Sequence, residues 1–168
     1  MHPQTYMAGD VPQPVQMSLK SLLPGSRVLS SSVWGELSYR QFLGHHLGWK
    51  DAKAAAEGWQ GDRYEVLETP DGLVFAFFSL WDDEAEAEAF FASWRKALAV
   101  RSAAAMPAAG GTVDIGQKRT WAEIKGRGVA IVESLSVAQT ARISAIAAAW
   151  REASSQSVPL SQPLRRPD

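Results

Sequence analysis

Four charged residues in the first half of the sequence have the types and the spacing to do chemistry. Glu36 and Arg40 lie four residues apart within a stripe of apolar residues, a spacing at which two side chains of one helix pair. Charges that are partly removed from water need further partners, and Asp62 and Arg63 are placed to supply them. This polar cluster is either a salt-bridge network that fixes a helix on a sheet or a site that binds or converts a ligand.

Seven tryptophans are many for 168 residues, and aromatic side chains can line a binding groove. Trp34 or Trp59 could roof the polar cluster, although Trp59 also falls on an expected core face. Trp121 alternates with charged residues along an expected strand, which favours an exposed position. Trp34, Trp59 and Trp121 are therefore the candidate contact surface.

The familiar catalytic and metal-binding patterns are missing. His45 and His46 are neighbours, so on a helix they point about 100° apart, whereas a zinc pair needs a spacing of three or four residues. The acidic run 82–88 lacks the loop spacing of a calcium site and instead predicts the beginning of a helix. Cysteine is absent, and neither G-x-S-x-G, a P-loop nor G-x-G-x-x-G occurs. We therefore expect no catalytic residue, no metal site and no cofactor.

Composition narrows the possible partners. The chain has 17 basic and 18 acidic residues and a net charge of −1, which leaves no positive excess to neutralise nucleic acid. No apolar stretch approaches the ~20 residues that span a bilayer, and Met1-His2-Pro3-Gln4 does not begin a secretory signal. With 46% hydrophobic residues the chain can form one soluble globular domain, with no nucleic-acid partner and no membrane insertion.

Hydrophobic periodicity predicts two helices, a β-hairpin and a third helix in the first half of the chain. In chain order these elements cover residues 33–47, 52–59, 63–68, 73–81 and 83–98. Val33, Leu37, Leu43 and Leu47 form the apolar stripe expected to face the core from the first helix. Gly72 is expected at the hairpin turn, where a positive φ is wanted.

The second half repeats the order of strand, turn, strand and helix. Strands are expected at 119–125 and 129–135, with a helix from residue 136. Asp83 with Glu86, and Ser136 with Gln139, have the spacing of capping boxes at the starts of the two later helices. The predicted fold class is α+β, a two-layer sandwich with a four-stranded antiparallel sheet and helices on one face, in the order ααββα-ββα.

Both ends of the chain differ in composition from the middle. Residues 1–24 contain four prolines and predict an extended arm that drapes over the domain without joining its core. Residues 25–153 are expected to form a single α+β domain, and the polar, proline-broken residues 154–168 a disordered tail. The alanine-rich segment 102–111 predicts a flexible connection between the two halves.

Three strings carry a resemblance to a known group of proteins. They are G-E-L at 35–37, A-A-A-E-G-W-Q-G-D-R-Y at 54–64, and L-W-D at 80–82 followed by E-A-E-A-F at 86–90. The chain resembles, over about residues 1–135, the C-terminal region of prokaryotic gluzincin-like metallopeptidase and surface proteins. That region has the pattern G-E, then A-A-x-G-W-x-G-D-R-Y, then W-D-x-x-x-x-A-x-x-F.

The resemblance implies an accessory domain, and it alone suggests an extracytoplasmic location. Gluzincin chemistry needs H-E-x-x-H on a helix, which this chain lacks, so the peptidase centre would belong to a longer parent or to another chain.

Three functions remain open at this point. The leading hypothesis is a non-catalytic accessory or binding domain of unknown ligand, with a protein partner or a metallopeptidase-like parent chain. The first alternative is a small enzyme or ligand-binding module that uses Glu36, Arg40, Asp62 and Arg63. The second is a subunit of a larger assembly, with Trp121 and the arm as contacts.

Overall fold

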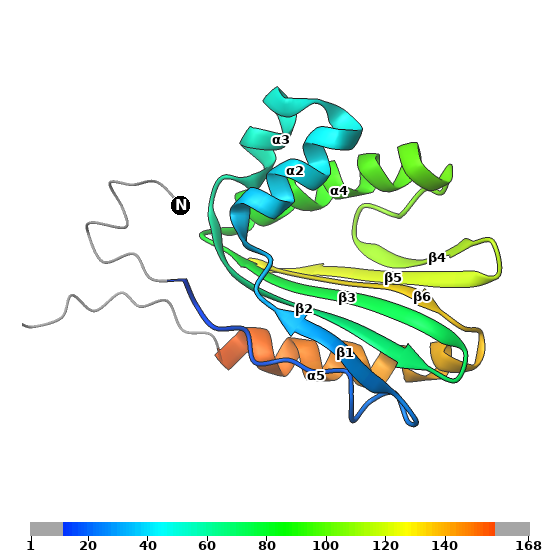
Figure 1. The fold of residues 1–168 in the computed structure, drawn as a ribbon. Coiled ribbons are helices and arrows are strands. Elements are labelled where there is room, and N and C mark those ends of the chain that lie inside the picture. The colour runs from blue at the N-terminus through cyan, green and yellow to red at the C-terminus, as the bar shows by residue number, and fades with distance from the viewer. Residues whose placement is uncertain (1–11, 157–168) are drawn as a thin grey trace, which may run out of the picture.

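A six-stranded antiparallel sheet lies between helices on both of its faces in the computed structural model, which describes residues 12–156 (Figure 1). The elements in chain order are β1 (Arg27–Ser32), α2 (Gly35–Leu47), α3 (Trp49–Ala56), β2 (Trp59–Thr69), β3 (Gly72–Trp81), α4 (Glu84–Ser102), β4 (Gly110–Ile115), β5 (Lys118–Lys125), β6 (Gly128–Leu135), the 3-10 helix η1 (Ala138–Arg142) and α5 (Ile143–Gln156).

The strand order across the sheet is β1-β2-β3-β6-β5-β4, so the pairing of β3 with β6 joins the two halves of the chain. The longest hairpin, β2 with β3, turns at Gly72, whose φ of 113° suits a residue without a side chain. There the Thr69 hydroxyl donates to the Gly72 carbonyl at 2.8 Å, which closes the turn. The predicted hairpin and its glycine are confirmed.

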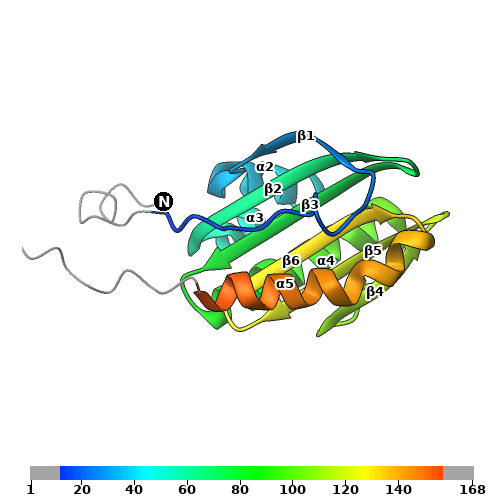
Figure 2. The ribbon, with the colours of Figure 1, turned by 90° about the horizontal axis from the view of Figure 1, so that it is seen from below.

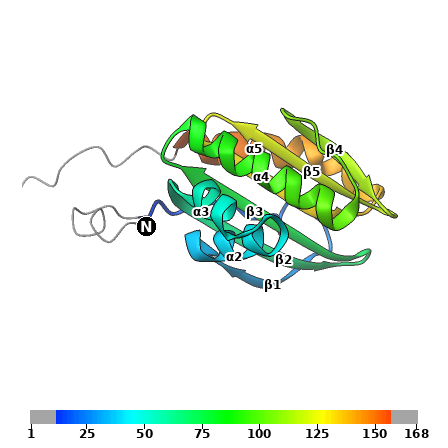
Figure 3. The same cartoon turned by 90° about the horizontal axis from the view of Figure 1, so that it is seen from above.

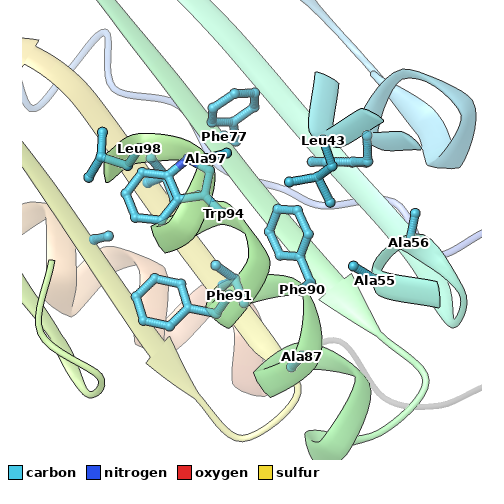
Figure 4. Packing of buried hydrophobic residues seen from close by; sticks show 14 of the residues in the cluster. Leu43, Ala55, Ala56, Phe77, Ala87, Phe90, Phe91, Trp94, Ala97 and Leu98 are labelled. Carbon is cyan, nitrogen blue, oxygen red and sulfur yellow. The ribbon is translucent and has the colours of Figure 1, made fainter. Parts of the chain in front are cut away.

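The upper face of the sheet is the one covered by α2, α3 and α4 (Figure 3). Its core contains six buried aromatic side chains. The Trp81 and Phe90 rings stack at 4.5 Å, and the Tyr39 and Phe90 rings meet edge to face at 5.1 Å. In Figure 4, Phe90 lies on the side of α4 that faces Leu43, and Phe91 lies on the other side. Helix α4 therefore contributes core side chains from two of its sides.

The lower face of the sheet is covered by α5 and by residues 12–24 (Figure 2). From Gln13 to Leu19 every second residue is buried, and Val15, Met17 and Leu19 all join the lower core. Helix α5 adds Ile146 and Trp150, which are fully buried. The segment therefore acts as an extra strip of core without pairing as a strand.

The structure confirms an α+β fold with an antiparallel sheet but corrects its details. The sheet has six strands instead of four, because β1 and β4 pair at its two edges. Strand β1 lacks regular alternation, and β4 begins with two glycines inside the segment 102–111 that was expected to be a flexible connection. The expectation that helices cover only one face of the sheet is also wrong, because α5 covers the face opposite to α4 and makes a third layer (Figure 1).

Two expectations about packing are also wrong. The arm does join the core in its described part, residues 12–24, since four of its apolar side chains are buried: Val15, Met17, Leu19 and Leu23. The predicted stripe faces the core only at its later members, because Leu43 is buried and Leu47 half-buried while Val33 and Leu37 are exposed. Residues 154–156 continue α5, and the expectations for 1–11 and 157–168 lie outside the described residues.

Candidate functional site

Asp62 anchors the beginning of α2 from the neighbouring strand β2. Its carboxylate accepts hydrogen bonds from the backbone amides of Trp34 at 2.7 Å and Gly35 at 2.8 Å, and from the indole N–H of Trp59 at 2.8 Å. Asp62 is only 2% exposed, so burial raises the pKa of its carboxyl, while these three hydrogen bonds lower it. The side chain thus replaces a local N-cap, since α2 has none of its own.

The Glu36 and Arg40 side chains form the expected pair on α2, with 3.8 Å between a carboxylate oxygen and a guanidinium nitrogen. They lie beside an open hollow of 390 Å³ at the beginning of α2, which we call the α2 hollow. Its lining consists of Trp34, Gly35, Glu36, Leu37, Arg40 and Trp59. The structure therefore brings together Glu36, Arg40, Trp34 and Trp59.

Arg63 lies apart from this group, on the lower face of the sheet. Successive residues of a strand point to opposite faces, so Asp62 faces α2 and Arg63 faces the arm. Arg63 approaches the carboxylate of Glu65 at 3.7 Å, and Glu65 accepts a hydrogen bond from the backbone amide of Leu19 at 2.8 Å. The expectation that Asp62 and Arg63 serve one polar cluster with Glu36 and Arg40 is therefore wrong for Arg63.

Trp121 is not at the surface. It is 4% exposed and packs in the lower core, so its expected exposure on an outer strand face is wrong. The strand bulges between Arg119 and Trp121, which shifts the alternation that the sequence suggested. Trp34 and Trp59 are half-buried, and Trp59 belongs to β2 instead of a helix.

The residues of the G-W-x-G-D-R-Y string, 58–64, each have a local structural role. Gly58 has a φ of 76°, and the carboxylate of Glu86 occupies the place where a side chain would begin. At Gly61 a Cβ would come within 2.1 Å of the backbone oxygen of Gln13, so only glycine lets the arm lie this close. The Tyr64 hydroxyl lies 3.0 Å from that of Ser30, across the β1–β2 pair. The string therefore joins the arm, β1, α2 and α4.

Three exposed apolar side chains on the α2–α3 layer were missed by the sequence reasoning. Val33 is 58% exposed, Leu37 64% and Trp49 65%, although periodicity placed the first two in the core. The Trp49 ring lies against Gly44, where a Cβ would come within 2.9 Å of it. Gly44 and Leu37 are seven residues apart, two helical turns, and so lie on one side of α2. Large exposed apolar groups that lie on one layer are typical of an interaction surface.

Two ionisable groups near the beginnings of α2 and α4, Tyr39 and Glu86, also have pKa values raised by their surroundings. Burial, and next the negative charge of Asp62, raises the pKa of the Tyr39 phenol well above its ordinary value. Burial, followed by the nearby carboxylates of Asp82, Asp83 and Glu57, raises the pKa of Glu86. Tyr39 lies inside the aromatic core, so its shift reflects packing and gives no reactive group.

Among residues 12–156 no three or more histidine and acidic side chains converge in a way that could hold a metal ion. In the same range no helix combines the length and the apolar character needed to cross a membrane.

The fold and the α2 hollow define an α+β domain with an open, partly aromatic surface site. Comparison with protein families gives a match over residues 25–144 to DUF8575, a domain of unknown function. The chain belongs to this family. Searches of curated proteins and of solved structures gave no match. The resemblance to metallopeptidase-associated domains stays a prediction, because the family match carries no such link.

Proposed function

We propose that this chain is a non-catalytic binding domain whose outer α2 surface receives an apolar side chain of a protein partner. The supporting observation is the α2 hollow, in which two half-buried indoles, Trp34 and Trp59, lie beside the exposed side chain of Leu37. An aromatic-lined hollow next to exposed aliphatic groups is the kind of place where an anchoring side chain loses its contact with water.

The apolar character continues beyond the hollow. Val33 precedes α2 and is exposed, and Trp49 begins α3 and covers Gly44 on the outer side of α2. Together with Leu37 they give the α2–α3 layer an apolar strip with the Glu36–Arg40 pair at its edge. A partly exposed ion pair adds little to affinity but sets orientation, as charged groups at interface rims commonly do.

The distribution of ionisable groups supports binding over catalysis. Asp62 already accepts three hydrogen bonds that hold α2 in place, and Glu36 is paired with Arg40. A general acid or base needs a proton position that faces substrate, and Asp62 is nearly inaccessible. The small-enzyme alternative also requires Arg63, which lies on the opposite face of the sheet.

The larger-assembly alternative relied on Trp121 and the arm as contacts. Trp121 is buried in the lower core, and the described part of the arm is held against the sheet. A binding role through α2 therefore needs fewer rearrangements than one through Trp121 or the arm.

Selection of phage-displayed random peptides on the immobilised chain tests the proposal. Bound peptides are expected to share an aromatic or aliphatic anchor, and a Leu37→Asp variant is expected to weaken their binding by about tenfold or more, since a buried charge opposes an apolar anchor. The matched control is Val137→Asp, which places the same charge at a residue that is 75% exposed and lies outside the α2–α3 layer.

Two results would contradict the proposal. One is that the selected peptides bind the wild type and the Leu37→Asp variant equally well, while Leu37→Asp and Val137→Asp both keep the wild-type melting temperature. The other is failure of the selection to enrich any peptide with an apolar anchor.

A further inference from the structure

A second hollow, of 420 Å³, lies between α4, β5 and the segment that leads to β4. It shares no lining residue with the α2 hollow. Phe91 and Ile124 provide the larger apolar side chains of its lining. Ala92 from α4 and the consecutive Ala108 and Ala109 leave the space open because their side chains are small. Its volume lies in the range of about 300–1,000 Å³ that small-molecule sites occupy.

Arg95 gives this hollow a fixed cation. Its Nε donates to the backbone carbonyl of Met106 at 2.6 Å, so the guanidinium is tied to the segment that forms the opposite wall. That bond uses one of the five N–H donors of the group, and no described residue accepts a hydrogen bond from its terminal nitrogens or forms an ion pair with it. Arg95 is half-buried, so unused donors at this position gain from an anionic partner.

Glu88 limits the charge that the hollow accepts. It also lines the hollow, two helical turns before Arg95 on α4, and it forms no ion pair with a described residue. A ligand with one carboxylate places its charge at Arg95 and its apolar body against Phe91. A second negative charge on the ligand would be repelled by Glu88.

We propose that this α4–β5 hollow binds a small apolar carboxylic acid. The carboxylate accepts two hydrogen bonds from the terminal nitrogens of Arg95, the fork geometry that guanidinium groups offer to carboxylates. The apolar body lies against Phe91, which is already buried, and covers Ile124, which is half-buried in the free chain and loses its remaining contact with water. This proposal is independent of the α2 surface, and either can fail while the other stands.

The hollow between α3 and α4 is the natural comparison. It has a similar volume of 370 Å³ and also contains one acid and one base, Asp51 and Lys96. It lacks an aromatic side chain in its lining, and its cation is an ammonium on a flexible stem without the planar fork. The same helix thus supplies a matched control position, Ala89, for Ala92.

Titration of the ¹⁵N-labelled chain with 4-phenylbutyrate, followed by ¹H–¹⁵N NMR spectra, tests the proposal. The amides of residues 91–95 and 108–109 are expected to shift together, and the neutral analogue 4-phenylbutan-1-ol to bind at least about tenfold more weakly, because it forms no charge-assisted hydrogen bond. Ala92→Leu fills the hollow and is expected to abolish binding, while Ala89→Leu, the same change on the same helix, leaves binding unchanged.

Arg95→Gln separates the role of charge from that of shape. It is expected to remove the preference for 4-phenylbutyrate over the alcohol while both still perturb the same amides. Equal affinity of acid and alcohol for the wild type would overturn the assignment of Arg95. Absence of binding at millimolar acid, or unchanged binding by a folded Ala92→Leu variant, would overturn the site itself.

Discussion

The two faces of the sheet bury their apolar residues in different ways. On the lower face, α5 and residues 12–24 close the core, and their apolar members fit against β2, β3 and β6. On the upper face three helices pack on an aromatic core, but α2 keeps Val33 and Leu37 in water. Both of the hollows proposed as binding sites are lined by residues of this upper layer.

This difference indicates which residues of the domain affect its stability and which affect binding. The core side chains of the lower face have almost no contact with solvent, so changes to them act on folding. The exposed groups of α2 contribute little to folding, and changes there act on binding. The string 58–64 links the two faces, because Asp62 holds α2 above the sheet while Gly61 admits the arm below it.

The largest loss of stability is expected from a substitution that disturbs the packing of the lower face. Gly61→Ala puts a methyl group against the backbone of Gln13, which cannot rotate away as a side chain would, and is expected to lower the free energy of unfolding by about 3 kcal/mol. Gly35→Ala is the matched control. Its φ of 79° disfavours alanine by about 1 kcal/mol, but open space surrounds the new methyl group. Denaturant unfolding followed by tryptophan fluorescence measures both, and equal losses would contradict the close approach of the arm.

The second-largest loss of stability is expected when the hydrogen bonds that hold α2 on the upper face are removed. Asp62→Ala leaves two backbone amides and one indole N–H without their acceptor, and is expected to cost about 2 kcal/mol. Hydrogen exchange at the amides of Trp34 and Gly35 should become faster while the lower core stays protected. Asp51→Ala, an exposed acid in the first turn of α3, is the control and is expected to change stability by less than about 0.5 kcal/mol. Unchanged exchange at the start of α2 would refute this role.

The smallest effect is a pH dependence of the upper layer. Burial, and next the positive potentials of His45 and Arg101, lowers the pKa of His46. The unfolded chain, with an ordinary histidine pKa of about 6.5, then binds a proton at pH values where the folded chain does not, so stability falls as the pH drops from about 6.5 toward the lower folded value. The melting temperature should decrease between pH 7.5 and 5.5, and His46→Gln should reduce this decrease. A steeper decrease of the melting temperature in the His46→Gln variant would contradict this role of His46.

Local features were predictable where a few neighbouring residues decide them. Ser136 and Gln139 form the expected reciprocal cap, with bonds of 2.8 and 3.2 Å between each backbone amide and the other side chain. Asp83 accepts from the amide of Glu86 at 2.9 Å, as its spacing predicted. The candidate site was predictable in part, because Glu36 and Arg40 pair within one helix.

The rest of the candidate site could not be predicted, because it depends on which face each element covers. The expected strand began at residue 63, so the sequence showed neither that Asp62 and Arg63 point to opposite faces of β2 nor that Asp62 would meet backbone amides of α2. Periodicity also placed Leu37 in the core, since an apolar stripe that binds a partner has the same spacing as one that packs on a sheet.

The sequence by itself determined the two central hairpins, β2 with β3 and β5 with β6, the turn at Gly72 and the caps at Asp83 and Ser136, because these follow from the torsional preferences and hydrogen bonds of adjacent residues. Only the tertiary structure decided that α4 and α5 lie on opposite faces and that the arm completes the core. It also decided which apolar groups stay in water. Those outcomes depend on contacts between residues far apart in the chain, such as Gly61 with Gln13 and Asp62 with Trp34.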